Sequence, residues 1–349
     1  MVKAVFISRH CSRIDAEDPT WKETAVTPYN PPLSARGFNE AKELGIRVKQ
    51  AMHDCGGSKL SIHSSPFLRC IQTASEIAKT VDNVELSIDC SLGEWITSDY
   101  FTDITPPPED NHRSLVETAH RYLNNSTTPG VNNRDAWKFG KGGEYDEEWS
   151  EMNERARKAL GCIIEEARMR TIESDSANGN IFIGEVILIV SHGAICNSLI
   201  GGLSNRPTLI NISVGSLSIA LPVEEKPVVD STSQSLIDRI GHWKLSQIGD
   251  MRRTSKSDSS DEEDVALWNS SRREMSTARS ILSRSGSVIT DSNHIRSRSG
   301  SKSRLHMLVN EGTKTQSGSL WKPQDLSKKL EATSDFNEPK IWNESQKQG

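Results

Sequence analysis

One stretch decides the fold: Val2-Lys3-Ala4-Val5-Phe6-Ile7-Ser8-Arg9-His10. Its β-branched and aromatic residues predict a buried strand over residues 2–8, and this strand stops at Arg9 and His10. In open α/β sheets, ligands bind beyond the carboxyl ends of the strands. The charged and titratable pair at the end of this strand is therefore the first candidate for a functional site.

Two further segments repeat the arrangement. Residues 59–64 alternate apolar with polar and stop at Ser65-Pro66, and residues 185–190 form a continuous apolar run that is typical of a central parallel strand. Apolar residues at helical spacing predict helices near residues 38–52 and 146–170. Ser65-Pro66 predicts the N-cap and first residue of another helix. The pattern indicates an α/β fold, a mostly parallel central sheet flanked by helices.

Four side chains are expected to meet at one edge of this sheet. Arg9 and His10 leave the first strand, Arg69 lies in the first turn of the helix after the second, and His192 follows the third. Two arginines and two histidines near a helix N-terminus form an anion site suited to phosphate.

The chemistry that fits these residues is phosphoryl transfer. A neutral His10 can attack phosphorus, while the arginines neutralise the charge of the transferring group. A protonated His192 would add a third positive donor. Glu94 is the candidate acid for the leaving oxygen, because a carboxyl beside a large apolar ring, here Trp95, tends to hold its proton to higher pH. This chemistry needs no metal, and the histidines and cysteines show no zinc-ligand spacing.

Composition divides the chain of 349 residues in two. Residues 1–250 alternate apolar runs and polar turns, as a folded domain does. Residues 251–349 carry 17 Lys and Arg against 13 Asp and Glu and few apolar positions, which predicts a disordered Ser/Arg-rich tail. The tail fits a solvated linker, and the alternative is a regulatory tail whose serines, flanked by acidic or basic residues, are kinase substrates. No aromatic interleaving supports nucleic-acid binding there.

The sequence also predicts a compartment. We expect no signal peptide and no membrane span, because residues 1–10 lack an apolar leader and no stretch reaches the length that crosses a bilayer. The six cysteines are scattered and are expected to be reduced thiols. A cytoplasmic and also nuclear location fits this pattern.

The motifs resemble the signature of the histidine phosphatase (phosphoglycerate mutase-like) superfamily. The resemblance runs to about Gly249 and rests on three segments: Arg9-His10, Ser64-Ser65-Pro66-Phe67-Leu68-Arg69-Cys70-Ile71-Gln72-Thr73-Ala74 and Val190-Ser191-His192-Gly193. It implies a phosphate pocket made of the four residues above, no cofactor, and a phosphorylated small molecule or phosphoprotein as substrate.

Within the superfamily, two further motifs are most similar to the ubiquitin-associated/SH3-type phosphatases and their fungal relatives. These are Arg9-His10-x-x-Arg13-x-Asp15 and Gly93-Glu94-Trp95. The likeness implies that Arg13 also lines the pocket and that Glu94 is the acid. One departure stands out, since Cys11 occupies the place where the family usually has glycine. A Cβ and a thiol there can narrow the pocket.

Other functions fit the sequence less well. Cysteine-based phosphatase chemistry through Cys11 would need an arginine six residues on, and that residue is Glu17. The main alternative is a catalytically weak interaction module, since some fungal relatives are subunits of a nuclear transcription complex. A phosphoglycerate mutase comes third, because Ser12-Arg13 does not continue the first motif as mutases do. The irregular, Pro-rich segment 97–141 is expected to form a lid over the site.

Overall fold

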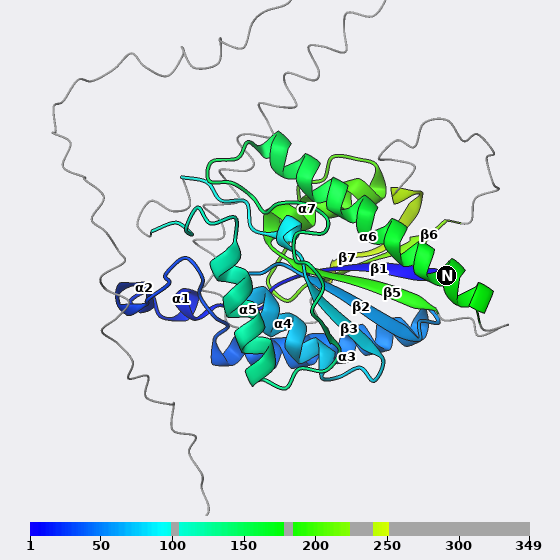
Figure 1. Ribbon diagram of the computed structural model, residues 1–349, viewed down its shortest axis with the longest axis horizontal. Coiled ribbons are helices and arrows are strands. Elements are labelled where there is room, and N and C mark those ends of the chain that lie inside the picture. The colour runs from blue at the N-terminus through cyan, green and yellow to red at the C-terminus, as the bar shows by residue number, and fades with distance from the viewer. Residues whose placement is uncertain (99–104, 178–183, 224–239, 251–349) are drawn as a thin grey trace, which may run out of the picture. The chain divides into compact units, whose positions relative to one another are not determined.

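The computed structural model describes residues 1–98, 105–177, 184–223 and 240–250. The predicted tail, residues 251–349, lies outside these ranges. One seven-stranded sheet, with the strand order β4-β3-β2-β5-β1-β6-β7, organises the described residues (Figure 1). The strands are β1 (Val2–Arg9), β2 (Lys59–Ser64), β3 (Val84–Ile88), β4 (Val131–Asn132), β5 (Glu185–Ser191), β6 (Leu217–Pro222) and β7 (Trp243–Asp250).

The centre of the sheet is parallel, as predicted. Strand β5 pairs in parallel with β1 and β2, and β2 pairs in parallel with β3. Strands β6 and β7 are antiparallel and close one edge. The parallel pairing brings the ends of β1, β2 and β5 to the same edge, with Arg9 opposite Ser191 and Ser64 opposite Val190.

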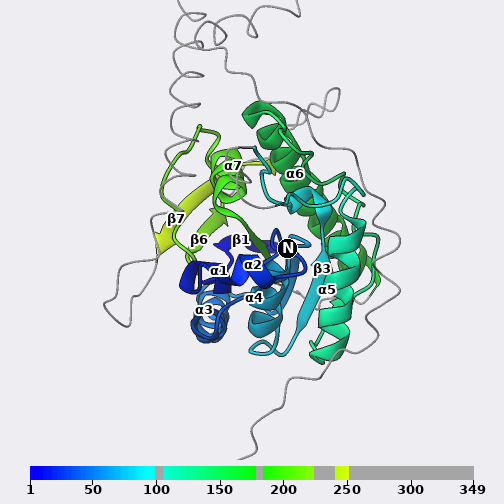
Figure 2. The ribbon, with the colours of Figure 1, turned by 90° about the vertical axis from the view of Figure 1, so that its left-hand side faces the viewer.

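Helices cover both faces of the sheet (Figures 1 and 2). Helices α3 (Ala35–Asp54), α4 (Leu68–Ala78) and α5 (Arg113–Asn125) pack on one face, and α6 (Trp149–Ala177) and α7 (Gly193–Ser204) on the other. Their apolar faces bury two core layers against the alternating side chains of the strands, which is the main source of stability for this architecture. Short helices α1 (Ile14–Glu17) and α2 (Trp21–Thr24) follow β1, and the 3₁₀ turn η1 (Cys90–Leu92) follows β3.

Two sequence predictions need correction. Helix α4 begins at Leu68, with Phe67 at the N-cap position, and not at Ser65-Pro66. The backbone N–H of Leu68 is capped by the Asn30 side chain from a distant loop, 2.8 Å away. The segment predicted to be an irregular lid contains helix α5 and strand β4. One side of α5, which includes Leu115 and Ala119, is buried.

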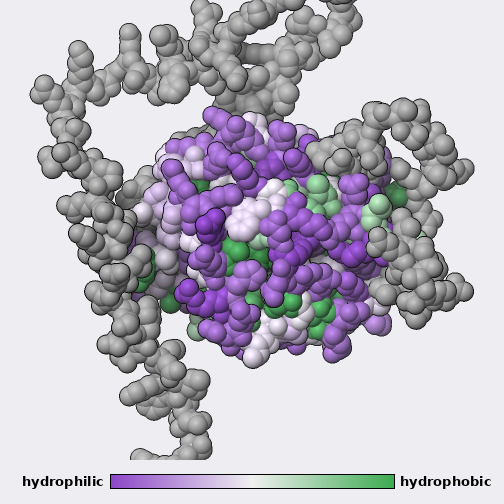
Figure 3. Space-filling view, viewed as in Figure 1, coloured by the Kyte–Doolittle hydropathy of each residue, from purple (hydrophilic) through white to green (hydrophobic). Residues whose placement is uncertain are grey.

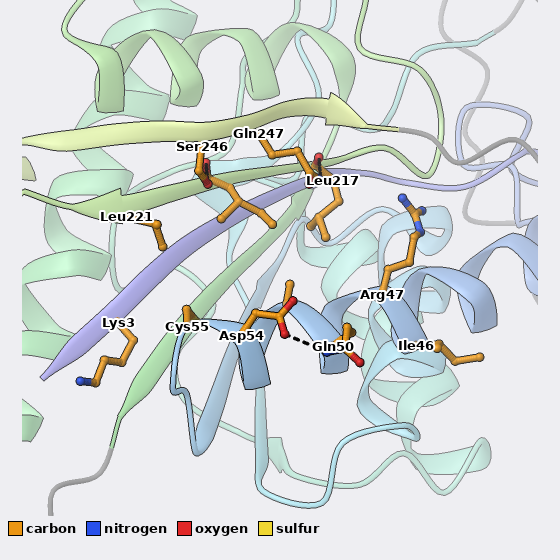
Figure 4. Close-up of a pocket in the computed structure, with 12 residues that line it drawn as sticks. Lys3, Ile46, Arg47, Gln50, Asp54, Cys55, Leu217, Leu221, Ser246 and Gln247 are labelled. Atoms are coloured by element: carbon orange, nitrogen blue, oxygen red, sulfur yellow. Dashed lines mark hydrogen bonds between the residues drawn. The ribbon is translucent and has the colours of Figure 1, made fainter.

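The surface seen in Figure 3 is mostly hydrophilic, with smaller hydrophobic areas between the polar ones. A groove of about 600 Å³ lies between α3 and strands β6 and β7 (Figure 4). Leu217, Ile219 and Leu221 of β6 line it together with polar residues such as Arg47 and Gln247. None of the predicted site residues lines this groove. Within the described ranges, no helix is long and apolar enough to cross a membrane.

Candidate active site

His10 lies at the carboxyl end of β1 and is 1% exposed. Its Nδ1 lies 2.8 Å from the carbonyl oxygen of Cys11. Because a carbonyl oxygen only accepts, Nδ1 carries the hydrogen and Nε2 keeps its lone pair. Burial lowers the pKa of His10 well below 6.5, and the nearby guanidinium groups of Arg69 and Arg9 lower it further. His10 is therefore a neutral imidazole of defined tautomer at physiological pH.

Three of the predicted residues form one buried cluster. Nη2 of Arg69 lies 3.2 Å from Oε2 of Glu94, and Nδ1 of His192 lies 3.0 Å from the same oxygen. The His192 ring stands edge-on to the His10 ring, with 5.5 Å between the ring centroids. Residues from β1, α4, the loop after β3 and the end of β5 thus meet at the carboxyl edge of the sheet, as the sequence predicts.

The ionisation of Glu94 differs from the prediction. Burial raises the pKa of Glu94, but His192 and Arg69 lower it more, to about 2. The neighbouring Trp95 ring was expected to keep the carboxyl protonated. Its effect is overridden because a permanent positive charge is in direct contact with the carboxylate. In the ligand-free protein Glu94 is a carboxylate.

His192 is uncharged at neutral pH, so it does not supply the third positive charge that the sequence suggested. Burial lowers the pKa of His192 to about 4, against the opposing effect of Glu94. The neutral ring donates from Nδ1 to Glu94, and its Nε2 lies 2.8 Å from the hydroxyl oxygen of Ser65, which donates to it. Positive charge at the site therefore comes from arginines.

Arg9 and Arg13 are both buried near His10, and both lower its pKa. Nη1 of Arg9 donates to the carbonyl oxygen of Ile212, 2.8 Å away. Nε of Arg13 donates to Asp15 at 3.0 Å. The arrangement concentrates guanidinium groups around an uncharged imidazole, which is the electrostatic setting that a phosphate dianion needs.

A family model for the histidine phosphatase superfamily (branch 1) matches residues 6–233. This chain belongs to the histidine phosphatase superfamily. Membership agrees with the fold, and it places Arg9, His10, Arg69 and His192 within the matched residues. No curated protein sequence matches the chain significantly.

Several solved structures resemble this chain at low sequence identity. The ecdysone phosphate phosphatase of Bombix mori, solved with tungstate, is 18% identical, with a TM-score of 0.43 over 67% of this chain and 97% of its own. A phosphoserine phosphatase from Entamoeba histolytica is 16% identical, with a TM-score of 0.38 over 71% and 98%. A phosphoglycerate mutase from Bacillus anthracis is 17% identical, with a TM-score of 0.35 over 71% and 92%. These similarities are too distant to indicate the substrate of this chain.

Ser65 and Phe67 also contact the predicted site residues, a role that the sequence patterns did not predict. Ser65 was interpreted as a helix cap, but its hydroxyl orients His192. The ring of Phe67 packs against both His192, at 5.1 Å between centroids, and the Arg69 guanidinium, at 4.6 Å. The sequence signal for both was their position directly after β2, next to Arg69.

Cys11 belongs to the apolar core. Its side chain is fully buried in the core layer formed with α3 and α4, next to Gly215. Burial raises the pKa of its thiol far above the ordinary value. The thiol is therefore an unreactive packing group. Among the described residues, no group of three His, Cys, Asp or Glu side chains is arranged to hold a metal ion.

Proposed function

We propose that this chain is a metal-independent phosphomonoesterase that works through a phosphohistidine on His10. The observation that carries the proposal is the state of His10: a buried, neutral imidazole with Nδ1–H fixed by Cys11 and with Arg9 and Arg69 nearby. A neutral Nε2 is the nucleophile that this chemistry requires, and the guanidinium groups stabilise the charge of the transferring phosphoryl group.

The reaction has two balanced steps. In the first, Nε2 of His10 forms a bond to phosphorus as the ester P–O bond breaks, and the leaving oxygen takes a proton from Glu94. In the second, water attacks the phosphohistidine, Glu94 takes a proton from this water, and inorganic phosphate leaves. Each group returns to its starting state.

Glu94 must gain a proton before the first step, because it is a carboxylate in the ligand-free protein. Binding of the substrate would raise the pKa of Glu94 in two ways. A phosphate group that binds Arg69 competes with Glu94 for the same guanidinium and brings negative charge next to the carboxylate. Both effects raise the pKa of Glu94, so that substrate binding is coupled to uptake of a proton.

Arg13 supports a narrower placement of this chain within the superfamily. Its burial near His10 supports a place beside the ubiquitin-associated/SH3-type phosphatases and their fungal relatives. The substrate class that we propose is a phosphorylated small molecule or a phosphoprotein. We further propose a cytoplasmic or nuclear location and a tail, residues 251–349, that kinases modify.

Hydrolysis of p-nitrophenyl phosphate by the full chain, with EDTA present, tests the function. We expect turnover in the wild type and none in His10→Ala, with an acid-labile phosphoenzyme trapped only in the wild type. His53→Ala is the matched control, because His53 is an exposed histidine of α3 and should leave turnover unchanged. Equal activity of His10→Ala and wild type would refute the phosphohistidine route.

A further inference from the structure

Arg155 of helix α6 holds the backbone of the loop that carries Glu94, and Trp149 of the same helix packs against Trp95 of this loop. Nη1 of Arg155 donates to the carbonyl oxygens of Ser91, at 2.8 Å, and Gly93, at 3.1 Å. These carbonyls lie just before Glu94 along the chain. One guanidinium nitrogen therefore contacts this backbone at two places, on either side of the Leu92 carbonyl oxygen, which accepts from the Ser191 hydroxyl at 2.7 Å.

Arg155 is itself held in one orientation. Its Nε lies 3.1 Å from both carboxylate oxygens of Glu147, and its Nη2 also donates to this carboxylate. The two side chains are only 12% and 7% exposed. The backbone oxygen of Glu147 accepts from Nε1 of Trp95, 2.8 Å away, so the pair holds the chain on both sides of Glu94.

Gly143 packs against this pair. A Cβ at Gly143 would lie 2.7 Å from Nη2 of Arg155 and 2.9 Å from the backbone oxygen of Glu94. Gly143 is buried, so glycine is needed here for close contact. Gly143 therefore allows the backbone to lie directly against the Arg155–Glu147 pair and the carbonyl oxygen of Glu94.

We propose that Arg155 is the positioning residue for the acid of the reaction. The inference rests on the proposed role of Glu94. Arg155 touches neither His10 nor the reacting atoms, and it acts by fixing the distance between the Glu94 carboxyl and the leaving oxygen. Proton transfer requires hydrogen-bond distance, so a small displacement of this loop weakens acid catalysis and leaves attack by His10 intact.

Leaving groups of different basicity separate this role from a general loss of structure. A p-nitrophenolate leaves well without a proton, whereas phenolate, which is more basic, depends more on the acid. The experiment measures kcat/KM of the full chain for both phenyl phosphate and p-nitrophenyl phosphate. The compared proteins are wild type, Glu94→Gln, Arg155→Lys and Arg157→Lys. A lysine at position 155 keeps a positive charge for Glu147 but cannot make the forked contacts.

We expect Glu94→Gln to lower the activity on phenyl phosphate far more than on p-nitrophenyl phosphate. Arg155→Lys should shift the ratio of the two activities in the same direction by about tenfold, a part of the total effect of an acid. Arg157→Lys, on the same helix but without contacts to this loop, should leave the ratio unchanged.

Equal losses on both substrates in Arg155→Lys would overturn the inference while the role of Glu94 stands. An unchanged ratio in Glu94→Gln would overturn both assignments, and His10→Ala would still test the phosphohistidine route separately. If Arg155→Lys does not fold, Glu147→Gln replaces it. This variant keeps the backbone contact to Trp95 but weakens the hold on Arg155, so the same shift of the ratio is expected.

Discussion

Replacing Glu94 by glutamine should destabilise the protein by a measurable amount. The pKa of Glu94 is held at about 2, below its ordinary value of 4.5. With about 1.4 kcal/mol for each pKa unit, this shift corresponds to at most about 3 kcal/mol of the free energy of unfolding, and only the part due to Arg69 acts at neutral pH, where His192 is uncharged. A depressed folded-state pKa stabilises above the unfolded-state value, and this contribution disappears as the pH falls from about 4.5 to about 2. At pH 7 it is fully present.

Urea denaturation of wild type and Glu94→Gln at pH 6, 7 and 8 measures this difference. We expect a gap of about 1–3 kcal/mol that stays constant over this range, because neither pKa lies within it. Glu76→Gln is the matched control. Glu76 is also buried, but its partner Lys79 is partly exposed, so the loss should be about 1 kcal/mol or less.

Two results would refute the reasoning. A gap below about 1 kcal/mol would mean that Arg69 does not stabilise a buried carboxylate at this position. A gap that changes steeply between pH 6 and 8 would mean that Glu94 titrates near neutrality. The second result would restore the expectation drawn from the neighbouring Trp95 ring.

Three further predictions concern the residues around His10. Ser65→Ala should leave Nε2 of His192 with only the weaker thiol of Cys70, 3.5 Å away, which costs about 1–3 kcal/mol of stability in urea denaturation and lowers kcat/KM for p-nitrophenyl phosphate. Cys11→Gly should destabilise by about 1–2 kcal/mol through lost packing and greater chain entropy, and it should change kcat/KM less than twofold; a large gain would show that the thiol obstructs the pocket. Because the pKa of His10 lies well below 6.5, kcat/KM between pH 5.5 and 7 should show no loss from protonation of the nucleophile; an acidic limb centred at pH 6.5 in this profile would contradict the assignment.

The central strands could be predicted because each one carries its own signal. The apolar runs of β1 and β5 predict buried strands from local sequence alone, and parallel strands bring their carboxyl ends together by geometry. His10, Arg69 and His192 follow from that geometry, since each lies just beyond such an end. Strand β4 was missed because two residues show no periodicity.

Contacts between distant segments could not be read in the same way. The serine hydroxyl that resembles a helix cap instead reaches His192, which lies 127 residues further along the chain. The start of α4 moves to Leu68 because Asn30, from another loop, supplies the cap. The local sequence predicts one hydrogen-bond partner for a polar group. In the folded chain a residue far away in the sequence can take the place of that partner.

The ionisation of Glu94 is the clearest case of this competition, and it bears on how the site works. A carboxylate that pairs with Arg69 stabilises the empty site by reducing the repulsion among its buried guanidinium groups. The same pairing makes it a poor acid. In the mechanism that we propose, a bound phosphate replaces Glu94 as the counter-ion of Arg69, and the pKa of Glu94 then rises. Under this proposal one residue both stabilises the ligand-free site and protonates the leaving group, because phosphate binding reverses the electrostatic surroundings of its carboxyl group.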